Sequence, residues 1–115
     1  MKDTRQLSQT YLRFANLANA IRGLPTLDAV EERVLRALAG AWATGQRLPV
    51  LQVVEITPDT SSATVHRRLK SLREKGLLEL REDEEDARIK YVVPTAETER
   101  YFAALGKCLT AAARG

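Results

Sequence analysis

The sequence is short of the residues on which most catalytic and metal centres depend. Among 115 residues there is one cysteine, one histidine and one tryptophan, and aromatic residues make up 5%. The lone Cys108 excludes an internal disulfide bond and is expected to pack as a small apolar side chain, and the lone His66 has no second imidazole with which to bind zinc. We also find no sign of a catalytic triad or acid–base pair. We therefore expect no enzyme activity, no metal and no cofactor.

Long apolar runs are missing as well. No uninterrupted stretch approaches the roughly 20 apolar residues that a bilayer-spanning helix requires. The first twenty residues carry Lys2, Asp3, Arg5 and Arg13 where a secretion signal would have an apolar core. We therefore expect a cytoplasmic protein without a membrane partner. The length and the ordinary content of apolar and charged residues favour a single folded domain over residues 1–115.

The net charge of +3 says little as a total, but its distribution is uneven. Residues 60–78 carry five Lys and Arg side chains against one acid, and residues 79–94 carry six acids against three cations. A basic segment is therefore followed directly by an acidic one. Such a basic segment is typical of a surface that binds an anionic partner, and a merely solvated helix face is the alternative.

Apolar periodicity predicts a helix over residues 5–22, because intervals of four and three residues line one face of a helix. Gly23 is expected to end it. A second helix should follow Asp28, a good N-cap with Glu31 three residues on, and a short third helix should begin at Pro49. The first helix carries an apolar stripe of Leu7, Tyr11, Phe14, Ala18 and Ile21.

The basic segment itself is predicted to be a helix over residues 61–75. A serine hydroxyl caps its start, and Gly76 ends it. Its apolar residues lie on one face, so the side chains between them point away from the core. The buried stripe consists of Val65, Leu69 and Leu72.

A β-hairpin is predicted next, with strands at 77–81 and 88–93 and an acidic loop between them. A last helix over residues 95–113 begins at Thr95, which acts as the cap with Thr98 at the third helical position. The fold class is therefore mostly α with a small β-hairpin (α+β).

This order of elements over residues 27–94 is that of a winged helix-turn-helix, flanked by N- and C-terminal helices, with a recognition helix at 61–75 and a wing at 77–93. Roughly residues 27–98 resemble MarR-like bacterial transcriptional regulators, at four places: Thr64-Val65, Leu72 to Leu77, Asp86 with Arg88, and Thr95. The resemblance implies sequence-specific binding of double-stranded DNA, with the recognition helix in the major groove. It also implies a small-molecule effector that the residues do not identify.

Two sets of DNA contacts follow from the recognition helix. Long cations can donate hydrogen bonds to base edges, whereas hydroxyl groups and further cations fix the register on phosphates. The expected base contacts are Ala63, His66, Arg67 and Lys70, and the expected backbone contacts are Ser61, Ser62, Thr64 and Arg68.

The wing contributes Asp86, Arg88 and Lys90 as candidates, but its acids would repel phosphates. One hypothesis is that Asp86 pairs with Arg88 and holds it at the minor groove. Another is that the wing does not bind DNA. A divalent-ion site in this loop lacks the spacing of a calcium-binding loop.

The terminal helices are expected to form a homodimer that places two recognition helices about 34 Å apart on a palindromic site. Packing of the two helices within a monomer is the alternative. The rival function is a winged-helix module for protein–protein interaction without DNA specificity. The predicted dimer interface comprises Leu7, Tyr11, Phe14, Ala18, Ile21, Phe102, Leu105 and Leu109.

Overall fold

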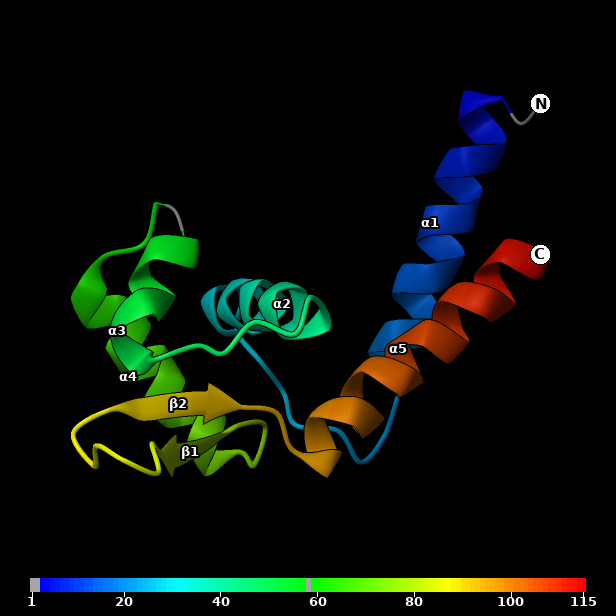
Figure 1. Cartoon of the computed structure of the whole chain (residues 1–115). Helices are drawn as coiled ribbons and strands as arrows, with labels where there is room; N and C mark the ends of the chain where they lie inside the picture. Colours follow the sequence, from blue (N-terminus) through cyan, green and yellow to red (C-terminus); the bar gives the residue numbers. More distant parts are fainter. Residues whose placement is uncertain (1–2, 58) are drawn as a thin grey trace. The chain divides into compact units, whose positions relative to one another are not determined.

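A computed structural model describes residues 3–57 and 59–115 (Figure 1). The order of elements agrees with the sequence analysis, and the α+β fold class with a small hairpin is confirmed. The elements are α1 (Thr4–Asn19), α2 (Ala29–Ala43), α3 (Val50–Val53), the 3-10 turn η1 (Val54–Ile56), α4 (Ser62–Glu74), β1 (Glu79–Glu82), β2 (Lys90–Val93) and α5 (Ala96–Arg114).

The chain divides into two compact units. The described residues up to Leu24 and the segment Glu99–Gly115 form one, which we call the terminal unit, and Pro25–Thr98 forms the other, which we call the winged-helix unit. The single domain expected over residues 1–115 therefore stays a prediction for the chain as a whole.

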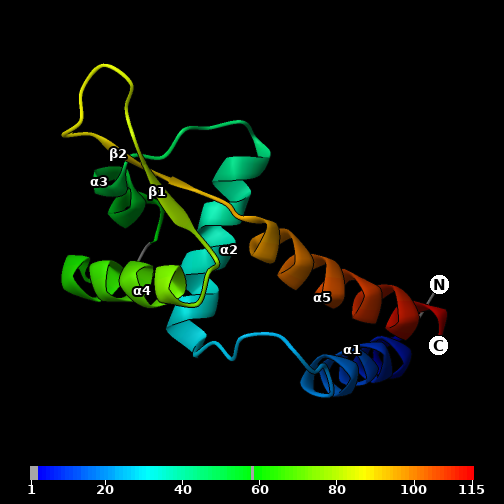
Figure 2. The ribbon, with the colours of Figure 1, turned by 90° about the horizontal axis from the view of Figure 1, so that it is seen from below.

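The terminal unit pairs α1 with most of α5. The Arg13 guanidinium of α1 joins them, because its Nε and Nη2 atoms donate hydrogen bonds to the Ala112 carbonyl oxygen at 3.3 and 3.1 Å. This carbonyl lies near the C-terminus of α5, where a cation also suits the helix dipole. Figure 2 shows the two helices side by side.

α1 leaves much of its apolar surface uncovered. None of its residues is buried, and Leu7 and Tyr11 are 55% and 64% exposed. On α5, Leu109 is 58% exposed. The remaining residues of the predicted interface are half-buried, namely Phe14, Ala18, Ile21, Phe102 and Leu105.

The prediction that the first helix extends to residue 22 is wrong, because α1 ends at Asn19. The Ala20 amide donates to the carbonyls of both Asn16 and Leu17, and the Ile21 amide reaches only three residues back, to Ala18. This tightened turn ends the helix, so Ile21 lies beyond it.

The core of the winged-helix unit lies between α2, α4 and the hairpin. The apolar stripe predicted for the fourth helix is buried, which confirms the face assigned to it. Figure 2 shows α4 crossing α2. Fully buried side chains include Val34, Leu35 and Leu38 of α2, Val65 and Leu72 of α4, and Leu77 and Val92 near and within the hairpin.

The two strands pair antiparallel, with Glu79 opposite Val93 and Glu82 opposite Lys90. The hairpin is also attached to the segment after α2. The Val92 amide donates to the Leu48 carbonyl oxygen at 2.7 Å, and the Trp42 indole donates to the Val92 carbonyl oxygen at 2.9 Å. The wing is therefore held against the body of the winged-helix unit.

Both strands begin two residues later than predicted. Before β1, the amides of Gly76 and Leu77 donate to Arg73 and Leu72 at the end of α4, with Gly76 at φ +80°, so these residues close the helix. Before β2, the Arg88 amide donates to the Asp86 side chain. In each case a local acceptor competes with the strand ladder.

The short third helix begins at Val50, one residue after the predicted start, and continues as η1. The buried Thr57 hydroxyl donates to the Val53 carbonyl oxygen at 2.8 Å, and Asp59 adopts a left-handed φ of 63°. Pro58, between these two residues, lies outside the described residues.

The predicted cap of α2 is present, and Glu31 of this cap also contacts α4. Asp28 accepts from the Glu31 amide, and the Glu31 Oε1 atom accepts from the Asp28 amide at 2.9 Å. The Glu31 carboxylate, 3% exposed, also accepts hydrogen bonds from Lys75 Nζ and the Ser71 hydroxyl at 2.8 Å. It therefore joins the start of α2 to the end of α4.

Three hydrogen-bonded groups keep this acid ionised. Burial acts to raise the pKa of Glu31, but the hydrogen bonds from Lys75, the Asp28 amide and Ser71 outweigh it and lower the pKa from 4.5 to about 2.

We predict that Glu31 makes the free energy of unfolding fall as the pH drops from about 5 to about 2. In the unfolded chain Glu31 is protonated near its ordinary pKa of 4.5, whereas in the folded chain it stays ionised down to about pH 2. Its contribution to stability is therefore fully present above pH 4.5 and is lost as the pH falls through the pKa of the folded state. It amounts to about 3 kcal/mol. Urea denaturation at a series of pH values measures it.

The variant Glu31→Gln should lose this part of the pH dependence. Glu32→Gln, which removes a half-buried carboxylate from the same helical turn, is the matched control and should retain it. Equal pH profiles for the wild type and Glu31→Gln would contradict the prediction.

Candidate functional site

The outward face of α4 gathers the residues predicted to contact bases. Ala63, His66, Arg67 and Lys70 are all exposed there. Arg73 is exposed as well, at the helical intervals of four and three residues that place it with His66 and Lys70. The sequence analysis did not assign Arg73 to this face, although the same spacing would have included it.

Hydroxyl groups order the start of α4. The Ser61 side chain caps the helix by accepting from the Thr64 amide at 3.2 Å, and its hydroxyl donates to Thr64 Oγ1 at 2.9 Å. The Arg67 Nη2 atom donates to the same Thr64 oxygen at 3.3 Å. The Arg67 guanidinium is thus directed toward the N-terminal end of the helix, and Ser62 stays exposed beside it.

Arg68 differs from its neighbour. It is half-buried, and its Nη2 atom lies 3.3 Å from an oxygen of Asp28 at the start of α2. Its Nε atom is buried and has no hydrogen-bond partner among the described residues. Arg68 therefore faces α2, while Arg67 and Lys70 face outward.

Two acids of the wing loop accept hydrogen bonds from within the loop. Asp83 accepts from the amides of Glu85 and Asp86 at 3.0 and 3.1 Å, and Asp86 accepts from the amide, Nε and Nη2 of Arg88 at 3.0 Å each. The predicted pairing of Asp86 with Arg88 is therefore present. The Arg88 side chain nevertheless remains 91% exposed.

The same contacts shift the pKa values of these groups. The Glu85 amide and then the Tyr91 hydroxyl lower the pKa of Asp83, and the Arg88 side chain and amide lower the pKa of Asp86. The hydrogen bonds to Asp86 in turn raise the pKa of Arg88. All three groups stay ionised at neutral pH.

Lys90 is paired across the hairpin. Its ammonium donates a hydrogen bond to Glu82, the residue opposite it in the register. Within the described loop, the side chains of Glu84 and Glu85 are then the acids with no ion-pair or hydrogen-bond partner. Arg88 and Lys90 therefore offset Asp86 and Glu82, and Arg47 lies near Asp83, so the negative charge of the loop is concentrated on Glu84 and Glu85.

A cluster that the sequence analysis did not identify lies at the base of the wing. The Arg47 guanidinium carbon sits 4.0 Å from the centre of the Tyr91 ring, and its Nη2 atom lies 3.9 Å from Asp83 Oδ1. The Tyr91 hydroxyl donates to the same Asp83 oxygen at 3.0 Å. The one signal for this cluster in the sequence is the alternation of the second strand, which places Tyr91 on the face opposite the buried Val92.

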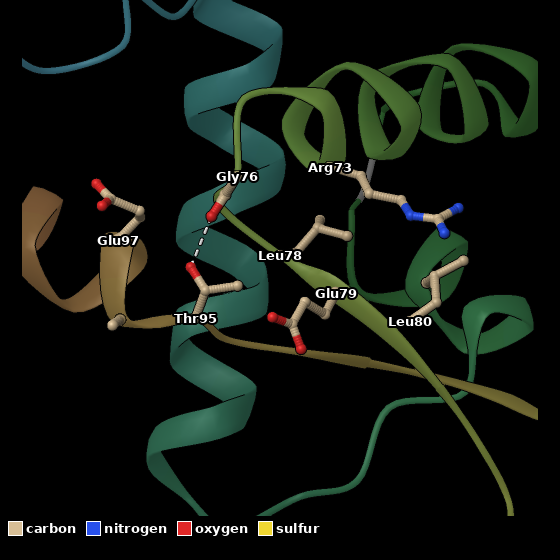
Figure 3. A pocket seen from close by; sticks show the side chains of 8 residues that line it. Arg73, Gly76, Leu78, Glu79, Leu80, Thr95 and Glu97 are labelled. Atoms are coloured by element: carbon tan, nitrogen blue, oxygen red, sulfur yellow. Dashed lines mark hydrogen bonds between the residues drawn. The ribbon is translucent and has the colours of Figure 1, made fainter.

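An open cleft of about 570 Å³ lies where α4, β1 and the start of α5 meet (Figure 3). The Thr95 hydroxyl donates to the Gly76 carbonyl oxygen at 2.6 Å across it, and Thr95 also caps α5 with Thr98 as predicted. The side chains of Arg73 and Glu97 extend in opposite directions. Arg73 and Glu97 therefore do not point toward each other across this cleft.

Two further features bear on the kind of site present. In the part of the chain that the structure describes, no group of three His, Cys, Asp or Glu side chains could hold a metal ion. No helix within residues 3–57 and 59–115 is long and apolar enough to cross a membrane. The basic face of α4 and the neighbouring wing are the charged features that remain.

Comparison with known proteins gives a likeness of fold. No family model and no curated protein matches the sequence. Among solved structures, BpsR of Bordetella bronchiseptica, whose DNA binding is regulated by 6-hydroxynicotinic acid, is 21% identical with a TM-score of 0.57, over 96% of this chain and 80% of that one.

Two other solved structures have a similar fold. A probable transcriptional regulator from Pseudomonas aeruginosa is 26% identical with a TM-score of 0.54, over 92% of this chain and 78% of that one. A MarR-like transcriptional regulator from Thermotoga maritima is 19% identical with a TM-score of 0.60, over 99% and 80%. The chain therefore has the winged-helix fold of MarR-like transcriptional regulators, as its motifs predicted.

Proposed function

We propose that this protein is a transcriptional regulator that binds double-stranded DNA in a sequence-specific manner, with α4 as the recognition helix in the major groove. The observation that carries the proposal is the exposed face of α4, on which no described acidic side chain pairs with Arg67 or Lys70. A basic helix followed by a hairpin in this order is suited to the groove and the adjacent backbone.

The base contacts in this proposal are Ala63, His66, Arg67 and Lys70. Arg67 can donate two hydrogen bonds to guanine, and its contact with Thr64 directs it toward the helix end that enters the groove. Ala63 is small and exposed, so it permits close approach of a base pair.

The phosphate contacts in this proposal are Ser61, Ser62, Thr64 and Arg68. Hydroxyl groups at a helix N-terminus suit phosphate oxygens. Arg68 is partly neutralised by Asp28, and its buried Nε atom is unpartnered. A phosphate beside the start of α2 would give this guanidinium a second anionic partner.

The wing is proposed to add a contact through Arg88 to the minor groove, with Asp86 orienting it and Lys90 near the backbone. The bidentate pairing of Arg88 with Asp86 and the high exposure of its side chain support this.

We further propose a homodimer formed through the terminal unit. The absence of any buried residue in α1 and the exposure of Leu7, Tyr11 and Leu109 support an association that covers them. An unidentified small-molecule effector is also proposed, because the DNA binding of BpsR is regulated by such a compound.

Selection of bound sequences from a random pool of duplexes tests DNA binding and specificity together. We expect a palindromic consensus whose half-sites lie about one helical turn apart. Binding should weaken steeply as salt rises, because phosphate contacts release counterions. Absence of salt-dependent binding would contradict the proposal.

The variant Arg67→Ala should lower the preference for the selected sequence about tenfold or more, because a bidentate base contact is lost. Arg68→Ala should weaken all sequences alike and flatten the salt dependence. Arg36→Ala removes an exposed cation from α2 and is the control, with specificity unchanged. Equal losses on selected and random duplexes for both α4 variants would contradict the division of contacts.

Sedimentation at micromolar concentration tests the dimer. The wild type should sediment at twice the chain mass of 12.8 kDa, and Leu109→Glu should sediment as a monomer, because a charge then faces the apolar interface. Leu51→Glu is the matched control, since Leu51 is 82% exposed on α3 and lies outside the terminal unit. A wild-type protein at the monomer mass would rule out the dimer.

A further inference from the structure

We infer that Asp83, Tyr91 and Arg47 form a positioning cluster that sets the conformation of the wing loop, residues 83–89, and through Asp86 presents Arg88 to DNA. The inference rests on the proposed function and adds three residues that the sequence motifs do not contain. None of the three needs to touch DNA.

Asp83 organises the loop from its first position. One of its carboxylate oxygens accepts from the amides of Glu85 and Asp86, and the other accepts from the Tyr91 hydroxyl. The Asp83 amide donates to the Ile89 carbonyl oxygen at 3.0 Å, which closes the loop. A single side chain thus joins the first turn of the loop to β2.

Asp86 carries this order to Arg88. Its amide is held by Asp83, which fixes the backbone from which its own carboxylate projects. Both of its oxygens then engage the Arg88 guanidinium, one at Nε and one at Nη2. An unbroken series of hydrogen bonds therefore runs from Tyr91 through Asp83 and Asp86 to Arg88.

Arg47 anchors this series to a different part of the chain. It belongs to the segment after α2, which is itself fixed where Leu48 accepts from the Val92 amide. Its guanidinium covers the Tyr91 ring and lies near Asp83. Arg47 also offsets the charge of Asp83, an acid that would otherwise face incoming phosphates.

The physical consequence is preorganisation. An arginine on a free loop loses side-chain and backbone entropy when it binds, whereas one that is already held loses less. The cluster should therefore raise DNA affinity through Arg88, and only when Arg88 is present.

The test is a double-mutant cycle on the duplex selected by the wild type. Tyr91→Phe keeps the ring under Arg47 and removes only the hydroxyl donor. We expect it to weaken binding about threefold to tenfold in the wild-type background, to have no effect in an Arg88→Ala background, and to add to the loss caused by Arg67→Ala.

Thr110→Val is the matched control, because among the described residues its hydroxyl donates to the Gly106 carbonyl oxygen of the same helix, α5. It should bind like the wild type. Asp83→Asn provides a second variant, which should repeat the dependence on Arg88. Without DNA, the NMR signal of Arg88 Nε–H should shift in Tyr91→Phe and stay unchanged in Thr110→Val.

The outcomes separate the inference from the proposed function. If Tyr91→Phe weakens binding equally with and without Arg88, or if Arg88→Ala binds like the wild type, the inference is overturned while DNA binding stands. An unchanged Arg88 signal overturns it without reference to DNA. If the wild type binds no duplex but the signal shifts, the proposed function fails and the cluster's control of Arg88 survives.

Discussion

The buried Glu31 carboxylate is the contact on which the arrangement of this fold depends. A charged group out of water is costly unless it is fully hydrogen-bonded, and Glu31 is satisfied by Lys75, Ser71 and the Asp28 amide together. These partners lie at the start of α2 and the end of α4, so one carboxylate helps to set the position of α4 relative to α2. Because the exposed face of α4 is proposed to contact DNA, the orientation of that face depends on the buried contacts of Glu31.

The wing shows that the position of unpaired charges matters as well as their sum. Counting residues makes this segment repulsive to DNA. In the structure Asp83 and Asp86 accept hydrogen bonds from within the loop, and Glu82 is paired with Lys90. The acids act as acceptors that shape the loop, while Arg88 extends into solvent. The hydrogen bonds and ion pairs thus leave Glu84 and Glu85 as the unpaired acids of the described loop.

Local signals predicted much of the fold because they involve neighbours in the chain. The Asp28 cap, the left-handed Gly76 and the stripe of α4 each need only a few consecutive residues, and each is present as expected. The errors came at the ends of elements. Strand alternation could not reveal that the Arg88 amide donates to the Asp86 side chain, or that the Leu77 amide donates to the Leu72 carbonyl at the end of α4. Both acceptors replace the strand-to-strand hydrogen bonds that the predicted strands would have made.

The sequence by itself determined the order of the elements, their buried faces and the basic helix that nominates the site, because periodicity, caps and charge runs act within a few residues. Only the tertiary structure decided that Glu31 joins two helices, that Arg68 turns toward Asp28, and that Arg47 reaches Tyr91 and Asp83. Each of these contacts joins residues about 35 to 45 positions apart, and no local pattern specifies which distant side chain will arrive.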